Sequence, residues 1–575
     1  MPLVYKVVRQ LCYCAACILL PITVAVSQVS VTTYHNDNAR TGQNTKETIL
    51  TPQNVNASAF GKLFSHTVDS YVYGQPLYLP GVAMPGKGTH NVVYVVTQHD
   101  SVYAFDADRT GGAATNPLWH VSFINPAVGI KTLNSSDTKC GDVPPEIGIT
   151  STPVINPATR TLYVVARTKE NGVYFQRLHA LDVATGAEKF GGPVVIKASV
   201  SGTGDASVDN QIDFDPLTEN QRAGLLFQNN LVFIAWGSQC DIDPYHGWLM
   251  AYDGTTLQQR AVWMSTPNGS EGAIWQSGAA PAADSLGNTY FATGNGTFDL
   301  DIDGEDYGNT IVKLGPMKSG SLPVADYFTP YNQSDLSARD LDLGSGGPTV
   351  LPNGVSALYP HLLAQVGKSG TLYLINRDNM GHYNPLGNLQ IVQNLPGAVS
   401  GQGSWMTPAW WNARLYVSGG GDYVKSFLFH ATTGSFAKAP ISQCTTKFMF
   451  PGSTPSISAN GLTNGIVWAL QEDAYGSKGS AVLHAFDAMD LANELYNSSQ
   501  NAARDDAGPA VKFAVPTIAN GKVFVGGEMQ LSVYGLLPAS GASHSPAGPA
   551  TQESTRRSAN STMEPYEKSS GGTTE

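Results

Sequence analysis

Carboxylates alternate along one short stretch of the chain. Residues 299–304 read Asp-Leu-Asp-Ile-Asp-Gly. Calcium takes oxygen ligands, and alternating Asp residues before a Gly turn are typical of calcium-binding loops. Asp303 is therefore a candidate metal ligand. The twelfth position of such a loop is Thr310 rather than Glu, which excludes an EF-hand, and a solvated acidic loop is the alternative interpretation.

Cysteine usage limits the redox and metal chemistry of the chain. Of its six cysteines, Cys12, Cys14 and Cys17 lie in an N-terminal apolar segment, and three more follow at positions 140, 240 and 444. After loss of that segment at most one internal disulfide can form, with one thiol left over. No Cys/His cluster has the spacing of a zinc site, and no Cys-x-x-Cys-His sequence is present for haem attachment.

Strands must position any such site, because short apolar strands recur in pairs along the chain. Most pairs end in an aromatic residue near an Asp or Asn. A unit repeated about every 60 residues is typical of a β-propeller with four-stranded blades. The eight pairs occupy 92–96 with 102–106, 162–165 with 178–182, 231–234 with 249–253, 289–292 with 310–314, 362–365 with 372–376, 415–417 with 426–429, 466–470 with 482–487, and 523–525 with 531–534.

A further short segment precedes each pair, and all but the third contain Pro. Pro is tolerated at the start or edge of a strand, so these segments are predicted to be the innermost strands. They begin at positions 75, 152, 223, 280, 347, 407, 454 and 515. The last pair has no fourth strand after it, so residues 60–65 are expected to close the ring by pairing with the final blade. The predicted fold is an all-β, eight-bladed propeller of four-stranded antiparallel blades.

The two ends of the chain differ in composition from the repeats. Residues 1–27 resemble a secretory signal, with Lys6 and Arg9 before an apolar stretch and small residues at its end. A membrane anchor is the alternative, although the stretch is short and Pro21 interrupts it. Residues 28–59 form a lead-in, 60–537 the propeller, and 538–575 a polar tail that is expected to be disordered. We expect an exported protein, periplasmic or extracellular, with no membrane span.

The charge balance bears on the kind of partner. The net charge is −12, which argues against nucleic acid and anionic membranes as partners. Acidic loops favour cations or neutral substrates such as alcohols and sugars, and simple solubility is an equally good explanation.

One repeat carries a recognisable signature. Residues 180–186 read Ala-Leu-Asp-Val-Ala-Thr-Gly, which resembles the repeat of pyrroloquinoline quinone (PQQ) proteins, and the resemblance in pattern covers 60–537. Those proteins are eight-bladed propellers, and in the quinoprotein alcohol dehydrogenases they hold PQQ and calcium. The resemblance implies PQQ and calcium as cofactors and oxidation of an alcohol as the reaction.

Four local motifs resemble segments that surround the quinone in those dehydrogenases. Gly272–Trp275, followed by 289–295, implies that Trp275 stacks under the quinone and that Asn295 is a calcium ligand. A core Trp is the alternative for Trp275, and a turn residue or glycosylation acceptor is the alternative for Asn295. The stretch 306–312 implies that Asp306 is the catalytic base, with Asp303 as the alternative, although the local pattern departs from the family here.

The other two motifs supply a basic and an aromatic residue. The segment 366–377 implies that Lys368 contacts the quinone oxygens, and an exposed turn lysine is the alternative. The segment 403–411 is similar to one that lines the funnel, which implies that Trp405 faces the cofactor. A structural Trp is the alternative.

The chain also departs from the dehydrogenase pattern. Those enzymes carry two adjacent cysteines over the quinone, whereas this chain has Cys140-Gly141-Asp142, so that disulfide cannot form. The glutamate that binds calcium has no clear match, and Asp241, the nearest carboxylate, is the candidate ligand in its place.

Two main hypotheses follow. The first is a PQQ- and calcium-dependent oxidoreductase that acts on alcohols, sugars or polyols. The second is a non-catalytic quinoprotein-like propeller that serves as a binding or assembly module, because propellers host many functions. A glycosidase or lyase with paired carboxylates is a third possibility. The partner is thus a small-molecule substrate or a protein.

Overall fold

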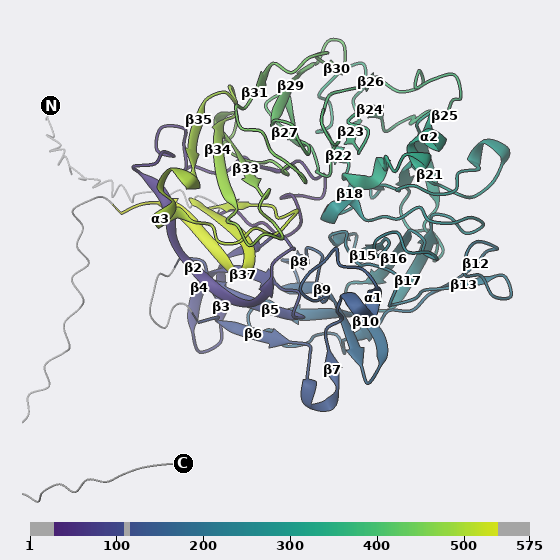
Figure 1. Ribbon diagram of the computed structural model, residues 1–575, viewed down its shortest axis with the longest axis horizontal. Coiled ribbons are helices and arrows are strands. Elements are labelled where there is room, and N and C mark those ends of the chain that lie inside the picture. Colours follow the sequence, from purple (N-terminus) through teal and green to yellow (C-terminus); the bar gives the residue numbers. More distant parts are fainter. Residues whose placement is uncertain (1–27, 109–115, 539–575) are drawn as a thin grey trace, which may run out of the picture. The chain divides into compact units, whose positions relative to one another are not determined.

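The computed structural model describes residues 28–108 and 116–538. The predicted signal peptide at 1–27 and the predicted tail from 539 onward lie outside the described residues. Within residues 28–537, eight small sheets follow one another along the chain and form the blades of a propeller (Figure 1). The all-β propeller prediction is therefore confirmed. Among the described helices, none is long and apolar enough to cross a membrane.

Blades 1 to 4 come from the first half of the chain, and their main strands pair antiparallel with their neighbours. Blade 1 contains β3 (Leu77–Met84), β4 (Gly88–Val96), β5 (Ser101–Asp106) and β6 (Trp119–Ser122). Blade 2 contains β8 (Val154–Asn156), β9 (Thr161–Glu170), β10 (Val173–Asp182) and β11 (Val194–Val195), with β7 (Ile130–Lys131) added to β9. Blade 3 contains β14 (Leu226–Gln228), β15 (Leu231–Trp236), β16 (Trp248–Asp253) and β17 (Gln259–Met264). Blade 4 contains β18 (Ala282–Ala283), β19 (Thr289–Ala292), β20 (Ile311–Leu314) and β21 (Val324–Thr329), with β25 (His382–Tyr383) added to β21.

Blades 5 to 8 complete the ring. Blade 5 contains β22 (Thr349–Val350), β23 (Leu362–Val366), β24 (Leu372–Asn376) and β26 (Gln393–Leu395). Blade 6 contains β27 (Ala409–Trp411), β28 (Arg414–Val417), β29 (Lys425–His430), β30 (Ser435–Phe436) and β31 (Ser442–Gln443). Blade 7 contains β32 (Ser456–Asn460), β33 (Thr463–Gln471), β34 (Val482–Asp487) and β35 (Glu494–Asn497), with β1 (Gln43–Asn44) added to β32. Blade 8 contains β36 (Thr517–Ala519), β37 (Lys522–Leu536) and β2 (Phe60–Tyr71).

The prolines of the segments that were predicted to be inner strands stand at the starts of those strands. In every blade except the third, Pro immediately precedes the first residue of the inner strand. Its carbonyl remains free to accept a hydrogen bond although its nitrogen cannot donate one. Thr349 of blade 5 donates to the Pro408 carbonyl of blade 6 at 2.5 Å, and Thr517 of blade 8 donates to the Pro76 carbonyl of blade 1 at 2.6 Å. These side chains link neighbouring blades at the axis.

The ring closes through the N-terminal strand, as the sequence predicted. β2 pairs antiparallel with β37, from Phe60 opposite Leu536 to Tyr71 opposite Glu528. Figure 1 shows the purple β2 beside the yellow β37. The start of β37 pairs with β36 and the rest pairs with β2. The first and last parts of the propeller therefore share one sheet, which leaves no unpaired edge between them.

The apolar core consists of layers between blades. One buried cluster fills each gap between neighbouring blades, and in the gap between blades 7 and 8 it contains Phe60, Trp468 and Tyr534. Each blade is only a few strands wide, so it can bury its two faces only against its neighbours.

The lead-in segment fills the axis. Residues 29–47, which we call the axial segment, run past the inner strands of all eight blades in order. Arg40 in this segment is 0 % exposed, and its guanidinium donates to the Pro281 carbonyl, to Thr33 and to the Tyr34 carbonyl. The contacts with successive blades join Val31 to Tyr78, Thr32 to Ile155, Asn38 to Phe227 and Ala283, Ala39 to Val350, Thr41 to Trp410, Gly42 to Ile457, and Asn44 to Ile518.

Candidate functional site

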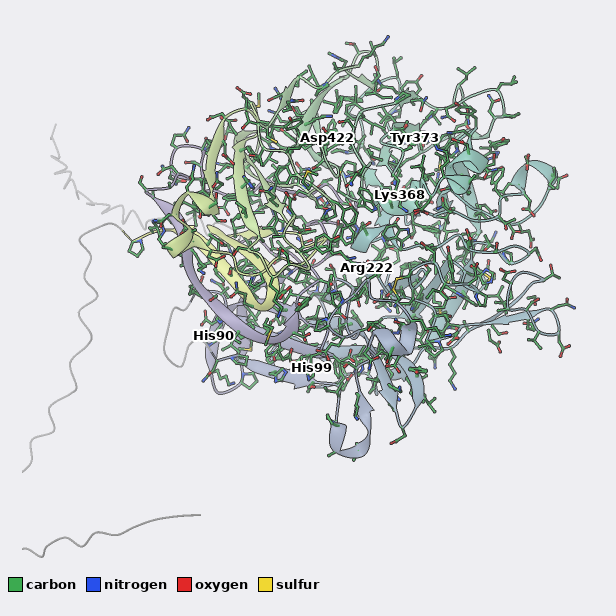
Figure 2. The ribbon with its side chains drawn as sticks, in the orientation of Figure 1. His90, His99, Arg222, Lys368, Tyr373 and Asp422 are labelled. Carbon is green, nitrogen blue, oxygen red and sulfur yellow. A yellow bond between two sulfur atoms is a disulfide. The ribbon has the colours of Figure 1, made fainter. Side chains whose placement is uncertain are left out.

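A cavity of about 330 Å³ lies where loops of several blades meet. Its walls come from loops that precede inner strands or that join the second and third strands of a blade. Figure 2 shows two lining residues, Arg222 and Lys368, near the middle of the ring. The lining residues are Cys140, Asp142, Asn220, Arg222, Ser238, Gln239, Cys240, Asp241, Trp275, Lys368 and Phe513.

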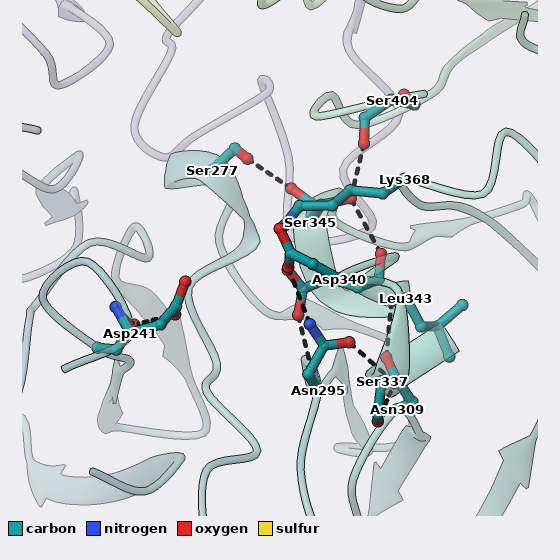
Figure 3. A network of polar contacts seen from close by, with 12 residues as sticks. Asp241, Ser277, Asn295, Asn309, Ser337, Asp340, Leu343, Ser345, Lys368 and Ser404 are labelled. Carbon is teal, nitrogen blue, oxygen red and sulfur yellow. Dashed lines mark hydrogen bonds and ion pairs between the residues drawn. The ribbon is translucent and has the colours of Figure 1, made fainter. Parts of the chain in front are cut away.

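Lys368 is held between two carboxylates. It lies in the turn between β23 and β24, and its Nζ is 2.7 Å from Asp340 Oδ1 and 2.6 Å from Asp342 Oδ2. Asp342 also accepts a hydrogen bond from the Asn295 backbone N–H at 2.7 Å, and Asp340 accepts one from the Asn295 side chain at 3.0 Å. Figure 3 shows Lys368, Asp340 and Asn295 joined in this network.

The network keeps the lysine charged beside an aromatic face. Burial pulls the pKa of Lys368 down, but the attraction of Asp342 and Asp340 outweighs that effect and leaves the pKa above its usual value. Burial raises the pKa of the Asp342 carboxyl, whereas Lys368 lowers it. Because the ammonium is stabilised by two carboxylates, we take the Lys368–Asp342 pair to be ionised. The Lys368 ammonium also lies 5.7 Å from the ring centroid of Trp275, which is half-buried and faces the cavity.

A disulfide forms part of the cavity wall. Cys140, from the loop before β8, and Cys240, from the loop after β15, are bonded with their Cα atoms 5.7 Å apart. Cys444 is the buried free thiol. The sequence allowed one disulfide among three cysteines, and the fold selects this pair. A disulfide between two adjacent cysteines is impossible in this chain, yet the Cys140–Cys240 disulfide still joins two loops at the cavity.

The three predicted metal ligands do not meet in one place. Asp241 lines the cavity and accepts a hydrogen bond from Ser238 at 2.7 Å, whereas Asp303 is exposed at the end of the short helix η4 (Leu300–Ile302). The Asn295 amide is already bonded to Asp340. Among the residues that the structure describes, no group of three or more His, Cys, Asp or Glu side chains could hold a metal ion. These three assignments remain predictions.

Asp306 lies outside the cavity lining. Its side chain is 1 % exposed and accepts a hydrogen bond from the backbone N–H of Asn268 at 3.0 Å, while its own N–H donates to Asp299 at 2.8 Å. Burial is the main cause that raises the pKa of Asp306 to about 6. Its predicted role as a base remains untested, and the carboxylates that contact Lys368 of the lining are Asp340 and Asp342.

Asp306→Asn is expected to change how stability depends on pH. The folded-state pKa of Asp306 is about 6, whereas an unfolded Asp titrates near 4. Between about pH 4 and 6 the unfolded chain therefore binds fewer protons here, so wild-type stability falls as pH rises through this window. The variant lacks this fall, and its melting temperature relative to wild type should rise from about pH 4 to 7. A difference that stays constant with pH would contradict this result.

Trp405 lies one aromatic ring away from the cavity. Its ring packs edge-on against Phe450 with centroids 4.8 Å apart, and Phe450 packs against Phe513 of the lining at 6.1 Å. Trp405 itself is not among the lining residues. Its predicted contact with a cofactor therefore stays a prediction.

Three residues at the site were missed by sequence reasoning. Asp340 and Asp342 lie in a loop before β22 with no strand periodicity, and Arg222 precedes the only inner strand that lacks Pro. The missing Pro was the one feature of the sequence that could have pointed to Arg222, because a repeat tends to lose its usual residues where a functional site replaces a structural one.

Comparisons with known proteins concern the fold. No protein-family model matches the chain, and no curated protein matches it. The quinohemoprotein alcohol dehydrogenase from Comamonas testosteroni matches with 15 % identity over 88 % of this chain and 80 % of that chain, with a TM-score of 0.55. The quinohemoprotein alcohol dehydrogenase ADHIIG from Pseudomonas putida HK5 matches with 14 % identity over 92 % of this chain and 82 % of that chain, also with a TM-score of 0.55.

A third solved structure extends this set. A europium-containing methanol dehydrogenase matches with 12 % identity over 88 % of this chain and 98 % of that chain, with a TM-score of 0.53. At these identities the likeness lies in the architecture, and function has to be argued from the site. The chain has the eight-bladed propeller fold of the quinoprotein alcohol and methanol dehydrogenases.

Proposed function

We propose that this protein is an exported oxidoreductase that uses PQQ to oxidise an alcohol, sugar or polyol. The observation that carries the proposal is the cavity in which an aromatic face, Trp275, and two cationic side chains, Lys368 and Arg222, face the same space. The structural neighbours named as quinohemoprotein alcohol dehydrogenases support the same reading at the level of fold.

The cavity residues fit a planar, anionic quinone. PQQ is a tricyclic quinone that carries carboxylates, so it needs a flat ring to stack on and positive groups at its edge. Trp275 offers the ring, while Lys368 and Arg222 offer the charges. Three buried polar atoms of the lining residues, Asn220 Oδ1, Arg222 Nη2 and Gln239 Nε2, have no hydrogen-bond partner among the described residues. Buried polar atoms without partners are costly, which favours a polar occupant.

Two side chains of the lysine network are the candidates for catalysis. When bound, PQQ would supply the hydride acceptor for alcohol oxidation. Lys368 would place positive charge beside the quinone oxygens and stabilise the charge that develops there. Asp340 is the exposed carboxylate of the lysine network, with 69 % of its side chain accessible. Asp340 is outside the cavity lining, as Asp306 is, but it contacts the lining residue Lys368 and is exposed, so we assign it the role of taking the alcohol proton.

The structure supports calcium binding less well than it supports PQQ binding. Asp340 and Asp342 both contact the Lys368 ammonium, Asp142 is paired with Lys512, and among the described residues no three His, Cys, Asp or Glu side chains group as metal ligands. The donor set as arranged here does not fit calcium, so no step is derived through it. Export is supported by the Cys140–Cys240 disulfide, because disulfides persist mainly in oxidising compartments.

Adding PQQ to the purified protein is expected to raise its melting temperature and change the quinone absorbance. Asp340→Asn should lower dye reduction with PQQ and an alcohol panel by about 10²–10⁴-fold while sparing PQQ binding, because it removes the proton acceptor. Asp306→Asn is the matched control and should retain activity. Loss of activity in the Asp306 variant alone would reassign the base to Asp306.

The same experiment separates the two hypotheses. Running each titration with and without added Ca²⁺ decides whether the cation contributes to binding. If PQQ changes neither the absorbance nor the melting temperature under either condition, the oxidoreductase proposal fails and the non-catalytic binding module becomes the better description.

A further inference from the structure

One buried cation of the cavity lacks a counter-ion. Arg222 is 5 % exposed, and its guanidinium makes one long hydrogen bond, from Nη1 to the Thr150 carbonyl at 3.4 Å. Its Nη2 has no hydrogen-bond partner in the part of the chain that the structure describes. Within residues 28–108 and 116–538, no carboxylate forms an ion pair with it. An ion that is removed from water without a partner costs several kcal/mol, so this arrangement needs compensation.

The nearest acidic groups do not provide that compensation. Asp142 is paired with Lys512. Glu472 is 1 % exposed, accepts a hydrogen bond from the Phe513 backbone N–H at 2.5 Å, and has its Oε1 unpaired. Both groups act on Arg222 only through longer-range electrostatics.

The surroundings hold the guanidinium in a defined position. The rings of Tyr73 and Phe513 lie 5.5 Å and 5.3 Å from Arg222 Cζ. Gly278 makes room for the group, because a Cβ atom there would lie 2.6 Å from Nη1. Gln239 Nε2, a second donor without a partner, belongs to the same lining. The aromatic contacts fix the side chain and leave part of its donor edge unused.

We propose that Arg222 is the receptor for a carboxylate group of the ligand in this cavity, with Gln239 as a second donor. A guanidinium presents two parallel N–H groups that match a carboxylate, and such charge-assisted pairs are the strong hydrogen bonds of proteins. The proposal requires only an anionic occupant, so it goes beyond the proposed oxidoreductase function. The carboxylate belongs either to PQQ itself or to a hydroxy-acid substrate.

Stability without ligand gives the first test. Because Arg222→Met removes an uncompensated buried charge, we expect the ligand-free variant to melt no lower than wild type. The matched control is Arg40→Met, at a buried arginine whose guanidinium is bonded to Thr33, Tyr34 and Pro281, and this variant should melt clearly lower. If Arg222→Met loses as much stability as the control, Arg222 has a structural role and the proposal is wrong.

Binding gives the second test and identifies the source of the carboxylate. We titrate wild type, Arg222→Met and Arg222→Gln with PQQ, with the trimethyl ester of PQQ, and with glycolate and malate, using calorimetry. Loss of a charged hydrogen-bonded pair should weaken binding of the recognised acid by roughly 10–100-fold in both variants. A loss seen with PQQ and absent with its ester assigns the carboxylate to the cofactor. A loss seen with glycolate or malate assigns it to the substrate.

These binding experiments distinguish failure of the carboxylate-receptor proposal from failure of the proposed oxidoreductase function. If PQQ does not bind but a hydroxy acid binds in an Arg222-dependent way, the oxidoreductase proposal fails and the proposal that Arg222 is a carboxylate receptor stands. If wild type binds none of these acids, or if both variants bind them as tightly as wild type, Arg222 is not a carboxylate receptor. The Gln variant decides the question if the Met variant does not fold.

Discussion

Phe60→Ala is expected to lower the free energy of unfolding by about 3–5 kcal/mol, the usual loss for a buried Phe. Phe60 is 0 % exposed and begins β2, the strand that closes the ring. Its ring lies 5.0 Å from Tyr496 and 5.4 Å from Trp468, measured between centroids. The truncation leaves a cavity between blades 7 and 8 where the two ends of the propeller meet.

The same substitution elsewhere on the strand provides the control. Phe64 also belongs to β2 but is only partly buried, so Phe64→Ala should lose less than half as much, about 1–2 kcal/mol. Urea-induced unfolding followed by tryptophan fluorescence measures both variants. Equal losses at the two positions, or no loss at Phe60, would show that the closing contact adds little to the stability of the ring.

Lys368→Met is expected to damage both stability and ligand binding. Asp342, with 10 % of its side chain exposed, would remain in the protein without its cation. Removing one partner of a buried ion pair costs about 3–5 kcal/mol, because the other charge is left uncompensated. If the proposed function is right, dye reduction with PQQ should also fall by about 10²–10³-fold, the effect of losing one charge-stabilising donor.

A double variant separates these two roles. Lys368→Met combined with Asp342→Asn removes both charges, so most of the lost stability should return while PQQ binding stays weak. Lys368→Arg keeps the positive charge and should retain part of both properties. Recovery of PQQ binding in the double variant would mean that Lys368 acts only through protein stability, and the cofactor role would then be abandoned.

The architecture was predictable because its signals are local. Short apolar runs recur in pairs, and Pro precedes all inner strands but one, so eight blades can be counted without knowing where they lie in space. The closing strand at Phe60 was also predictable, because the last repeat lacked a strand and a ring must pair its edges. The pairing of β2 with β37 confirms that reasoning.

The site was less predictable because its members are distant along the chain. Trp275 and Lys368 were named from local motifs and share one cavity in the structure. Arg222, Asp340 and Asp342 carry no such motif. Asp306, a motif-derived candidate, is instead bonded to the Asn268 backbone away from the lining. Local sequence patterns therefore predict candidate residues, whereas the loops that meet in the fold decide which of those candidates share a cavity.

By itself the sequence determined the number of blades, the order of their strands and the way the ring closes. These features depend on periodicity and on the pairing needs of backbone groups, which act over a few residues at a time. Only the tertiary structure decided that Cys140 bonds to Cys240 and that the axial segment fills the axis. It also decided that Lys368 is paired, whereas Arg222 has no counter-ion among the described residues. Those outcomes depend on which loops of the ring meet at the axis, because burial and ion pairing are set by spatial neighbours rather than by sequence neighbours.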